Sequence, residues 1–282
     1  MGKQCYILPD FIVIGANKAG TTSVANYLND CPQVGMSRIK EPMFFSSINI
    51  KKSIDKHSAT LANPYFALNL KEYSELFEHH NPKIVRLYGE ASTSYLANPR
   101  ISAPMIRSIV PDVKLIAILR EPIDRVISAY KMTYGNKIET RTLSEIIDEY
   151  CKNNLEYKIK NQHGVKQYIE NGFYYQLLKI YFDYFPKEKI LLLKYDDLKK
   201  DPRTFMNKIF HFLRIEPCAS DFSRIYNTQY MHLKGKKVVV TDEDRVKLAK
   251  IFYNEIKNLL KFIDVSDWLS KYNLIFNRND KS

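Results

Sequence analysis

A short stretch near the beginning of the chain combines the residue types that bind phosphate. It runs from Phe11 to Ser23 and has the sequence FIVIGANKAGTTS. The apolar residues at its start predict a buried strand, and Gly15 and Gly20 bracket a tight loop that leads into a helix. The backbone N–H groups of such a loop, together with the dipole of the following helix, bind anions. The stretch therefore predicts a phosphate site.

The position of one lysine separates two kinds of phosphate chemistry. The spacing from Gly15 to Gly20 matches the Walker A loop of nucleotide triphosphatases, which then requires a lysine and a serine or threonine. Here Gly20 is followed by Thr21, and the lysine lies inside the loop as Lys18. We expect Lys18 to lie beside a bound phosphate and to face a leaving group. The alternative, a chance glycine loop with a solvated lysine, stays open at this point.

A second cation follows another predicted strand. Residues 115–119 form an apolar run typical of a parallel sheet, and Arg120 follows instead of the aspartate that binds Mg²⁺ in a Walker-type enzyme. A predicted helix begins two residues later and carries Ser128 off its apolar face. An arginine at a strand end and a serine two turns into the next helix can clamp one phosphate. The alternatives are an ion pair of Arg120 with a neighbouring carboxylate and ordinary helix packing for Ser128.

Four residues are candidates for a general base. Glu41 precedes a proline and a short apolar run, which predicts a carboxylate at the edge of an apolar patch. The alternative for Glu41 is a glutamate in a surface turn. Glu90 follows a predicted strand and precedes small hydroxyl residues, at the edge where open α/β sheets bind ligands. His163 and His232 lie in predicted loops and complete the set.

The order of the predicted elements indicates the fold class. Helical patterns separate four apolar runs that are predicted strands, at residues 11–14, 84–89, 115–119 and 190–194. This alternation predicts an α/β fold, P-loop-like, with three α/β/α layers and a central parallel sheet of four to five strands. We expect residues 1–282 to form a single domain, with insertions near 46–82 and 133–170.

Composition limits the function classes. The net charge is +12 and the sequence pI is about 9.3, so anionic ligands or nucleic acid are expected partners. The basic residues are scattered and no RNA-binding aromatic signature is present, which disfavours nucleic acid but leaves a basic binding protein as an alternative. The four cysteines form no CxxC pair and imply neither a zinc site nor a disulfide framework. No membrane-spanning run or signal peptide is apparent, and we expect a cytoplasmic location.

Taken together, these motifs resemble the sulfotransferases that use 3′-phosphoadenosine 5′-phosphosulfate (PAPS). The loop from Gly15 to Thr22 is similar to their 5′-phosphosulfate loop, and residues 119–128, LREPIDRVIS, are similar to their 3′-phosphate motif. The segment from Lys40 to Phe45 resembles the one that carries the glutamate base in heparan-sulfate-type enzymes. The resemblance covers nearly the whole chain and implies that family's fold, a central parallel sheet with helices on both faces.

The resemblance also implies an activity and a set of site residues. It implies transfer of a sulfonate from PAPS to a hydroxyl or amine of a small-molecule acceptor, with 3′-phosphoadenosine 5′-phosphate (PAP) as product and no metal. The alternatives are a carbohydrate or oligosaccharide acceptor and, more distantly, an ATP/Mg-dependent kinase. The implied catalytic residues are Glu41 as base and Lys18 on the leaving oxygen. The implied cofactor contacts are Lys18, Ala19, Gly20, Thr21, Thr22, Arg120, Ser128, Lys234, Gly235 and Lys236.

The chain also departs from the heparan-sulfate pattern. Heparan-sulfate 3-O-type enzymes have a lysine after the glutamate that corresponds to Glu90, and this chain has Ala91. Their disulfide near the C-terminal basic loop and the membrane anchor of Golgi members have no apparent counterpart. These departures favour a soluble, bacterial-type enzyme with a small acceptor, shaped by the insertions near 46–82 and 133–170. The sequence does not indicate the oligomeric state.

Overall fold

The computed structural model describes residues 5–47, 67, 69–152, 167–218, 221–222 and 238–279. The chain divides into two compact units. Unit 1 comprises Met1–Leu119 and Leu177–Asn227, and unit 2 comprises Arg120–Gln176 and Thr228–Ser282. The expectation of one domain over residues 1–282 stays a prediction. Most of the insertion predicted near 46–82 and part of that near 133–170 lie outside the described residues.

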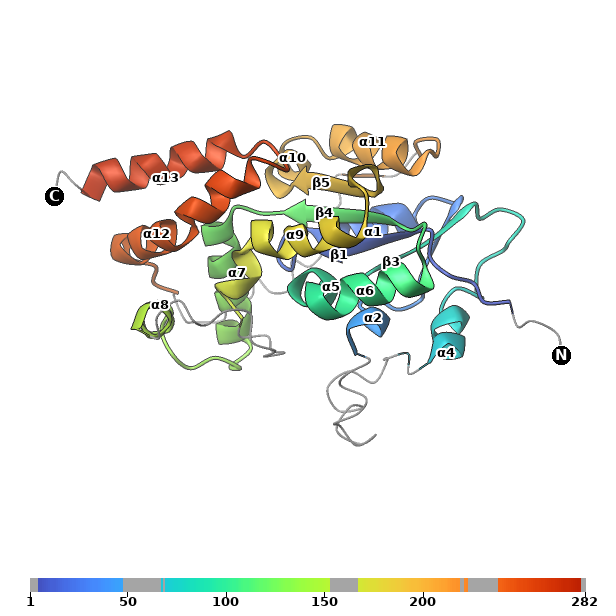
Figure 1. Ribbon diagram of the computed structural model, residues 1–282, viewed down its shortest axis with the longest axis horizontal. Coiled ribbons are helices and arrows are strands. Elements are labelled where there is room, and N and C mark those ends of the chain that lie inside the picture. Colours follow the sequence, from blue (N-terminus) through green and yellow to red (C-terminus); the bar gives the residue numbers. More distant parts are fainter. Residues whose placement is uncertain are drawn as a thin grey trace. The chain divides into compact units, whose positions relative to one another are not determined.

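Unit 1 is built on a sheet that has five parallel strands in the described residues, in the order β2-β3-β1-β4-β5. Figure 1 labels β1, β3, β4 and β5. The strands are β1 (Phe11–Gly15), β2 (Val34–Met36), β3 (Leu87–Ala91), β4 (Lys114–Leu119) and β5 (Ile190–Lys194). The central parallel sheet predicted from the sequence is therefore confirmed. β2 adds a short edge strand that the apolar pattern did not reveal.

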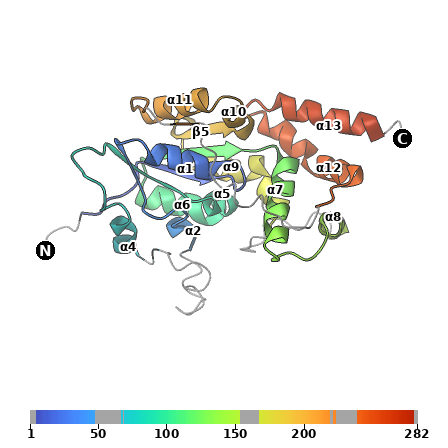
Figure 2. The same cartoon turned by 180° about the vertical axis from the view of Figure 1, so that it is seen from behind.

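Helices cover both faces of this sheet. The helices of unit 1 are α1 (Thr21–Asn29), α2 (Phe44–Ser47), α4 (Leu70–Glu75), α5 (Ser94–Ala97), α6 (Pro99–Ile109), α9 (Tyr174–Tyr184), η3 (Lys187–Lys189), α10 (Tyr195–Lys200) and α11 (Pro202–Leu213). The first three residues of α9 belong to unit 2. α9 lies in front of the sheet in Figure 1, and α1 lies in front of it when the molecule is turned round in Figure 2. The three-layer α/β/α arrangement is therefore confirmed for unit 1.

The central strands are buried on both faces. The side chains of residues 11–14 in β1 and 115–119 in β4 are fully buried. A strand covered by helices on both sides needs apolar residues at every position, which is why these strands are unbroken apolar runs. Each of the Phe, Val, Ile and Leu side chains in these runs contributes roughly 1.5–3 kcal/mol by leaving water. The strand ends that carry the loops of unit 1 are thus anchored in its core.

Unit 2 is helical in its described residues. Its elements are α7 (Pro122–Gly135), α8 (Leu143–Lys152), η2 (Glu170–Gly172), α12 (Asp242–Leu259) and α13 (Ser266–Asn279). The buried carboxylate of Glu121 caps α7 by accepting the N–H of Ile123 at 2.8 Å. It also accepts hydrogen bonds from Lys271 at 2.7 Å and from the hydroxyl of Tyr272 at 2.6 Å, both on α13. This carboxylate therefore fixes the start of α7 against α13.

One strand boundary predicted from the sequence was wrong. The apolar pattern placed a strand at residues 84–89, whereas β3 spans Leu87–Ala91. The N–H groups of Ile84 and Val85 both donate to the carbonyl of Asn81, at 3.0 and 3.1 Å, and so form a turn. The first apolar residues of the run therefore form a local turn. The strand begins later, at Leu87, and continues past Gly89 to Ala91.

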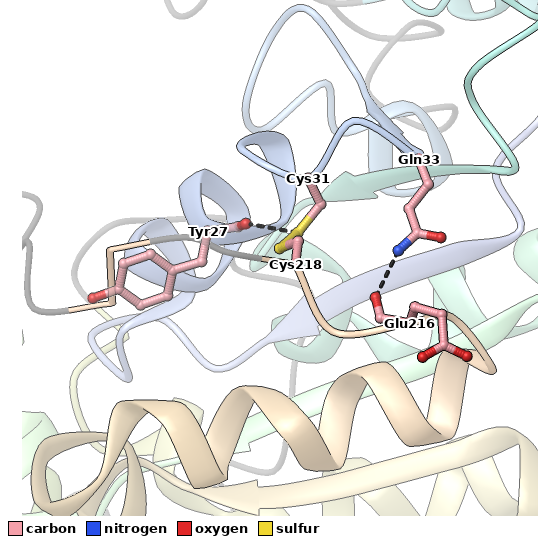
Figure 3. Close-up of a disulfide and its surroundings, with 5 residues drawn as sticks. All are labelled: Tyr27, Cys31, Gln33, Glu216 and Cys218. Atoms are coloured by element: carbon pink, nitrogen blue, oxygen red, sulfur yellow. Dashed lines mark hydrogen bonds between the residues drawn. A yellow bond between two sulfur atoms is a disulfide. The ribbon is translucent and has the colours of Figure 1, made fainter.

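The structure contains a disulfide that the sequence analysis did not expect. Cys31, just after α1, is bonded to Cys218, which follows α11, with a sequence separation of 187 residues (Figure 3). Such a separation carries no local pattern, so cysteine spacing could not show the pair. Beside the bond, the side-chain amide of Gln33 donates to the carbonyl of Glu216 at 2.6 Å. The segment after α11 is thus fixed at two points to the residues that follow α1.

The disulfide gives a stability prediction. Replacing Cys31 by Ser should lower the free energy of unfolding by about 2–4 kcal/mol, because the unfolded chain loses a long covalent loop. Urea denaturation monitored by circular dichroism measures this change. Cys151→Ser is the matched control, since Cys151 is an exposed free cysteine.

A reducing agent should reproduce the loss in the wild-type protein and leave Cys31→Ser unaffected. Equal stability of the oxidised wild type and Cys31→Ser would contradict this account of the bond.

Candidate active site

The loop between β1 and α1 contains two residues whose backbone has a positive φ, a conformation that is uncommon outside glycine. Lys18 has φ 69° and Gly20 has φ 81°, both in the left-handed region. A Cβ on Gly20 would also come within 2.8 Å of the ring of Tyr195. Gly20 is therefore required by conformation and by space, whereas Lys18 is held in a strained backbone. Strain of this kind is commonly kept where a side chain must point in one direction.

The N-terminus of α1 has the character of an anion site. Gly20 is its N-cap and so provides no capping side chain, and the first turn carries no acidic residue. Val24 makes the first bond of the helical ladder, to the carbonyl of Gly20 at 3.2 Å, so the N–H groups of residues 21–23 precede that ladder. Thr21 is buried and Thr22 is half-buried. These N–H groups and the helix dipole fit a phosphate beside Lys18.

The carboxylate of Glu41 is held in one orientation. Its Oε2 accepts the backbone N–H of Thr93 at 2.8 Å, and its Oε1 accepts the hydroxyl of Thr93 at 3.1 Å. Lys40 donates to Oε1 at 2.7 Å, and the Glu41 side chain remains 21% exposed. The backbone of Glu41 is also in the left-handed region, with φ 63°. An oriented and accessible carboxylate has the geometry that a general base requires.

Glu90 is placed very differently. Its side chain is fully buried, and Oε1 accepts the hydroxyls of Tyr73 at 2.8 Å and Tyr95 at 2.6 Å. Its Oε2 accepts the hydroxyl of Ser92 at 2.7 Å. Burial raises the pKa of Glu90 to about 7, the three hydroxyls oppose this rise, and the nearby charge of Glu41 adds to it. Because the Glu90 side chain is fully buried whereas that of Glu41 is 21% exposed, this arrangement favours Glu41 over Glu90 as the group that meets a substrate.

The second predicted phosphate motif lies in unit 2. Arg120 directly follows β4 and is half-buried, and Ser128 is a half-buried position of α7 among buried neighbours. Glu121 adjoins Arg120 and Asp124 lies four residues after Arg120, and both carboxylates interact with another cation. Lys271 donates to Glu121 at 2.7 Å and to Asp124 at 3.0 Å. Burial opposes the shift, but the charges of Lys271 and Arg120 lower the pKa of Asp124, so the alternative of an ion pair between Arg120 and a neighbouring carboxylate stays open.

Some predicted site residues cannot be placed, and some important ones were missed. Lys234, Gly235 and Lys236, as well as His163 and His232, lie outside the described residues. No group of His, Cys, Asp and Glu that could hold a metal ion occurs in the described part of the chain.

Sequence reasoning missed the role of Thr93 in holding Glu41. The run of hydroxyl residues after β3 was the available signal, but it was assigned to ligand binding.

Comparison with known proteins places the chain in a family. The family model described as "Sulfotransferase domain" matches residues 8–273, so the chain belongs to the sulfotransferase family. It is 24% identical over 297 residues to the bifunctional heparan sulfate N-deacetylase/N-sulfotransferase 1 of Caenorhabditis briggsae, covering 94% of this chain and 32% of that protein. The chain spans less than half of the length of the curated relatives that it matches.

Solved structures support the same fold. A sulfotransferase from Alicyclobacillus acidocaldarius aligns with a TM-score of 0.75 and 24% identity, covering 93% of this chain and 99% of that one. A mouse sulfotransferase solved in complex with PAP aligns with a TM-score of 0.54 and 13% identity, covering 94% of this chain and 88% of that one. At these identities the likeness shows the fold alone.

The buried Glu90 predicts a pH dependence of stability. Since its pKa is raised from the usual 4.5 to about 7, the folded chain keeps a proton that the unfolded chain has lost between these values. The stability that it contributes is complete below pH 4.5 and is lost as the pH rises through about 7. Relative to Glu90→Gln, the free energy of unfolding of the wild type should fall by roughly 3 kcal/mol as the pH rises from 4.5 to about 7.

Denaturation of the two proteins at a series of pH values from about 4 to 8 measures the difference. Glu75→Gln on α4, where the side chain is 43% exposed, is the control for removing a carboxylate elsewhere in unit 1. A constant difference between wild type and Glu90→Gln would show that Glu90 titrates normally.

Proposed function

We propose that this chain transfers a sulfonate group from PAPS to a hydroxyl or amine of an acceptor, and that residues 1–282 act as one sulfotransferase domain. The observation that carries the proposal is the N-terminus of α1, which has no capping side chain and no acid and follows the strained Lys18. Membership of the sulfotransferase family supports it. The PAP in the mouse structure supports the choice of nucleotide.

The residues of the chain fit the two phosphate groups of this nucleotide. We assign the 5′-phosphate to the backbone N–H groups of residues 19–22 and to Lys18, because the start of α1 is suited to an anion. We assign the 3′-phosphate to Arg120 and Ser128, a guanidinium and a hydroxyl that can donate together. Lys234, Gly235 and Lys236 are proposed to close over the nucleotide. The proposal includes no metal, because Thr21 and Arg120 replace the lysine and aspartate of a magnesium-dependent Walker site.

Each catalytic residue has one task in this proposal. PAPS supplies an activated sulfonate whose leaving group is the 5′-phosphate of PAP. Glu41 accepts the proton of the attacking hydroxyl or amine, and Thr93 keeps its carboxylate oriented for that step. Lys18 balances the charge that develops on the leaving phosphate oxygen. The N–H groups of α1 hold that phosphate in line with the attack.

The acceptor is proposed to be a small molecule, and a saccharide is the second candidate. The saccharide is favoured by the names of the relatives, which include a carbohydrate sulfotransferase and heparan sulfate N-sulfotransferases. The ATP-dependent kinase remains the more distant alternative, disfavoured by Thr21 where its lysine belongs. Labelled PAPS with a panel of 4-nitrophenol, an aliphatic alcohol, an amine and a glucosamine-containing oligosaccharide decides among these acceptors.

The cytoplasm is the proposed location. None of the helices in the described ranges is long and apolar enough to cross a membrane. The Cys31–Cys218 disulfide is an observation against the cytoplasm, because such bonds persist mainly in oxidising compartments. Alkylation of thiols in intact cells, followed by mass spectrometry, shows whether this cysteine pair is reduced, as expected in the cytoplasm, or oxidised, as expected in an oxidising compartment.

The first functional prediction concerns the 3′-phosphate. Arg120→Ala should weaken PAP binding by about 2–4 kcal/mol, because one side of a charge-assisted pair is lost. Affinity for AMP, which lacks the 3′-phosphate, should change little. Isothermal calorimetry measures both, with Arg107→Ala as a matched control for loss of one exposed arginine. Equal affinity of the wild type for PAP and AMP would rule out the assigned 3′-phosphate site.

The second functional prediction concerns the base and the lysine. Glu41→Gln should lower kcat by about 10²–10⁴ and leave PAP affinity near the wild-type value, because only proton transfer is lost. Lys18→Ala should lower both kcat and the affinity for PAP, since the charge of Lys18 contacts the phosphate in the ground state and in the transition state. Steady-state kinetics with labelled PAPS and calorimetry with PAP separate the two patterns.

Glu75→Gln is the control for removing a carboxylate from the surface. If Glu41→Gln kept wild-type turnover while Glu90→Gln or His163→Ala abolished it, the base would have to be reassigned to that other residue.

A further inference from the structure

A set of hydrogen bonds joins the buried Glu90 to the backbone that carries Glu41. The hydroxyl of Ser92 donates to Glu90 at 2.7 Å and accepts the N–H of Met43 at 3.1 Å. The hydroxyl of Tyr95 donates to Glu90 at 2.6 Å and lies 3.4 Å from the N–H of Phe45, which donates to it. Each hydroxyl therefore connects the carboxylate of Glu90 to an amide of the segment that follows Glu41.

The carboxylate sets the direction of both links. At a pH above its pKa of about 7, Glu90 is ionised and only accepts hydrogen bonds, so each hydroxyl gives its proton to Glu90 and turns a lone pair toward a backbone N–H. Burial raises the pKa of Tyr95 well above 10, which keeps this hydroxyl a donor. Glu90, Ser92 and Tyr95 are all fully buried, so water does not compete for these bonds.

Two further contacts join the same segments. The N–H of Glu41 donates to the carbonyl of Ala91 at 2.9 Å, and Thr93 holds the Glu41 carboxylate itself. The backbone of Glu41 and Met43 is in the left-handed region, with φ 63° and 52°. A segment with two such residues relaxes unless several bonds hold it, so these links are what keep Glu41 in its orientation.

We propose that Glu90, Ser92 and Tyr95 are positioning residues, which hold residues 41–45 so that the Glu41 carboxylate stays aligned for proton transfer. This inference rests on the proposed function, because it takes Glu41 as the base. The residues touch neither substrate nor nucleotide in this proposal. They act on the reaction through Glu41, and they should therefore affect kcat more than nucleotide binding.

Tyr73 offers a matched control for Tyr95. Both tyrosines are fully buried, and both donate their hydroxyls to Oε1 of Glu90, at 2.8 and 2.6 Å. Only the Tyr95 hydroxyl also accepts an amide of the 41–45 segment. Tyr73→Phe and Tyr95→Phe therefore remove equivalent bonds to Glu90, but only Tyr95→Phe breaks a link to the segment that carries the base.

The experiment compares Ser92→Ala, Tyr95→Phe and Tyr73→Phe at about pH 8, with labelled PAPS and the acceptor of the panel that reacts fastest. Ser92→Ala should lower kcat about tenfold and Tyr95→Phe about threefold to tenfold, because misplacing a base lowers the fraction of aligned complexes. The KM for PAPS and the affinity for PAP should stay within about twofold of wild type, since binding contacts are intact. Tyr73→Phe should keep kcat within about twofold, because it breaks no link to the segment.

Hydrogen–deuterium exchange gives a second readout that does not depend on turnover. The amides of Met43 and Phe45 should exchange faster in Ser92→Ala and Tyr95→Phe, respectively, and at the wild-type rate in Tyr73→Phe. Wild-type kcat in Ser92→Ala, or an equal loss of kcat in Tyr73→Phe and Tyr95→Phe, would overturn the proposal. Failure of the proposed function would differ, since the wild type itself would then bind no PAP.

Discussion

Left-handed backbone at non-glycine residues is the constraint on which the candidate site depends. Lys18, Glu41 and Met43 have φ values of 69°, 63° and 52°. Each such residue costs on the order of 1–3 kcal/mol and persists only where its surroundings over-determine it. For Glu41 and Met43 those surroundings are the hydrogen bonds to residues 91–95. The two residues to which we assign the chemistry thus occupy the backbone that most needs support.

The parallel sheet fixes the positions at which the loop after β1 and the hydroxyl residues after β3 begin. β1 and β3 are neighbours and run in the same direction, with Val13 paired to Ala91. Their carboxyl ends therefore lie at one edge, where the chain leaves β1 toward Lys18 and leaves β3 toward the hydroxyl residues. The N–H of Ser92 donates to the carbonyl of Val13 at 3.1 Å, which extends the pairing beyond the strands. The buried carboxyl ends of β1 and β3 thus give both loops a fixed starting point.

The features that the sequence predicted are those with a local signature. Unbroken apolar runs predicted β1 and β4, which the structure confirms. The capping box from Thr241 to Asp244 at the start of α12 is a local pattern of the same kind. β2 has three residues, one of them glycine, and gains its strand character only by pairing with β3. The disulfide and the contact between Glu41 and Thr93 join residues far apart in the chain, so only tertiary structure could reveal them.

The hydroxyl run after β3 shows why chemical type alone was misleading at this site. The small hydroxyl residues after Glu90, which include Ser92, were expected at the edge of the sheet that binds ligands, yet the hydroxyls of Ser92 and Tyr95 donate to Glu90 inside the core. A buried carboxylate is costly, and replacing a buried charged network by apolar residues is often neutral or stabilising. Apolar side chains, however, cannot accept a backbone N–H, whereas hydroxyls committed to Glu90 can. Stability alone therefore does not account for Glu90, but the need to hold a strained segment in one arrangement does.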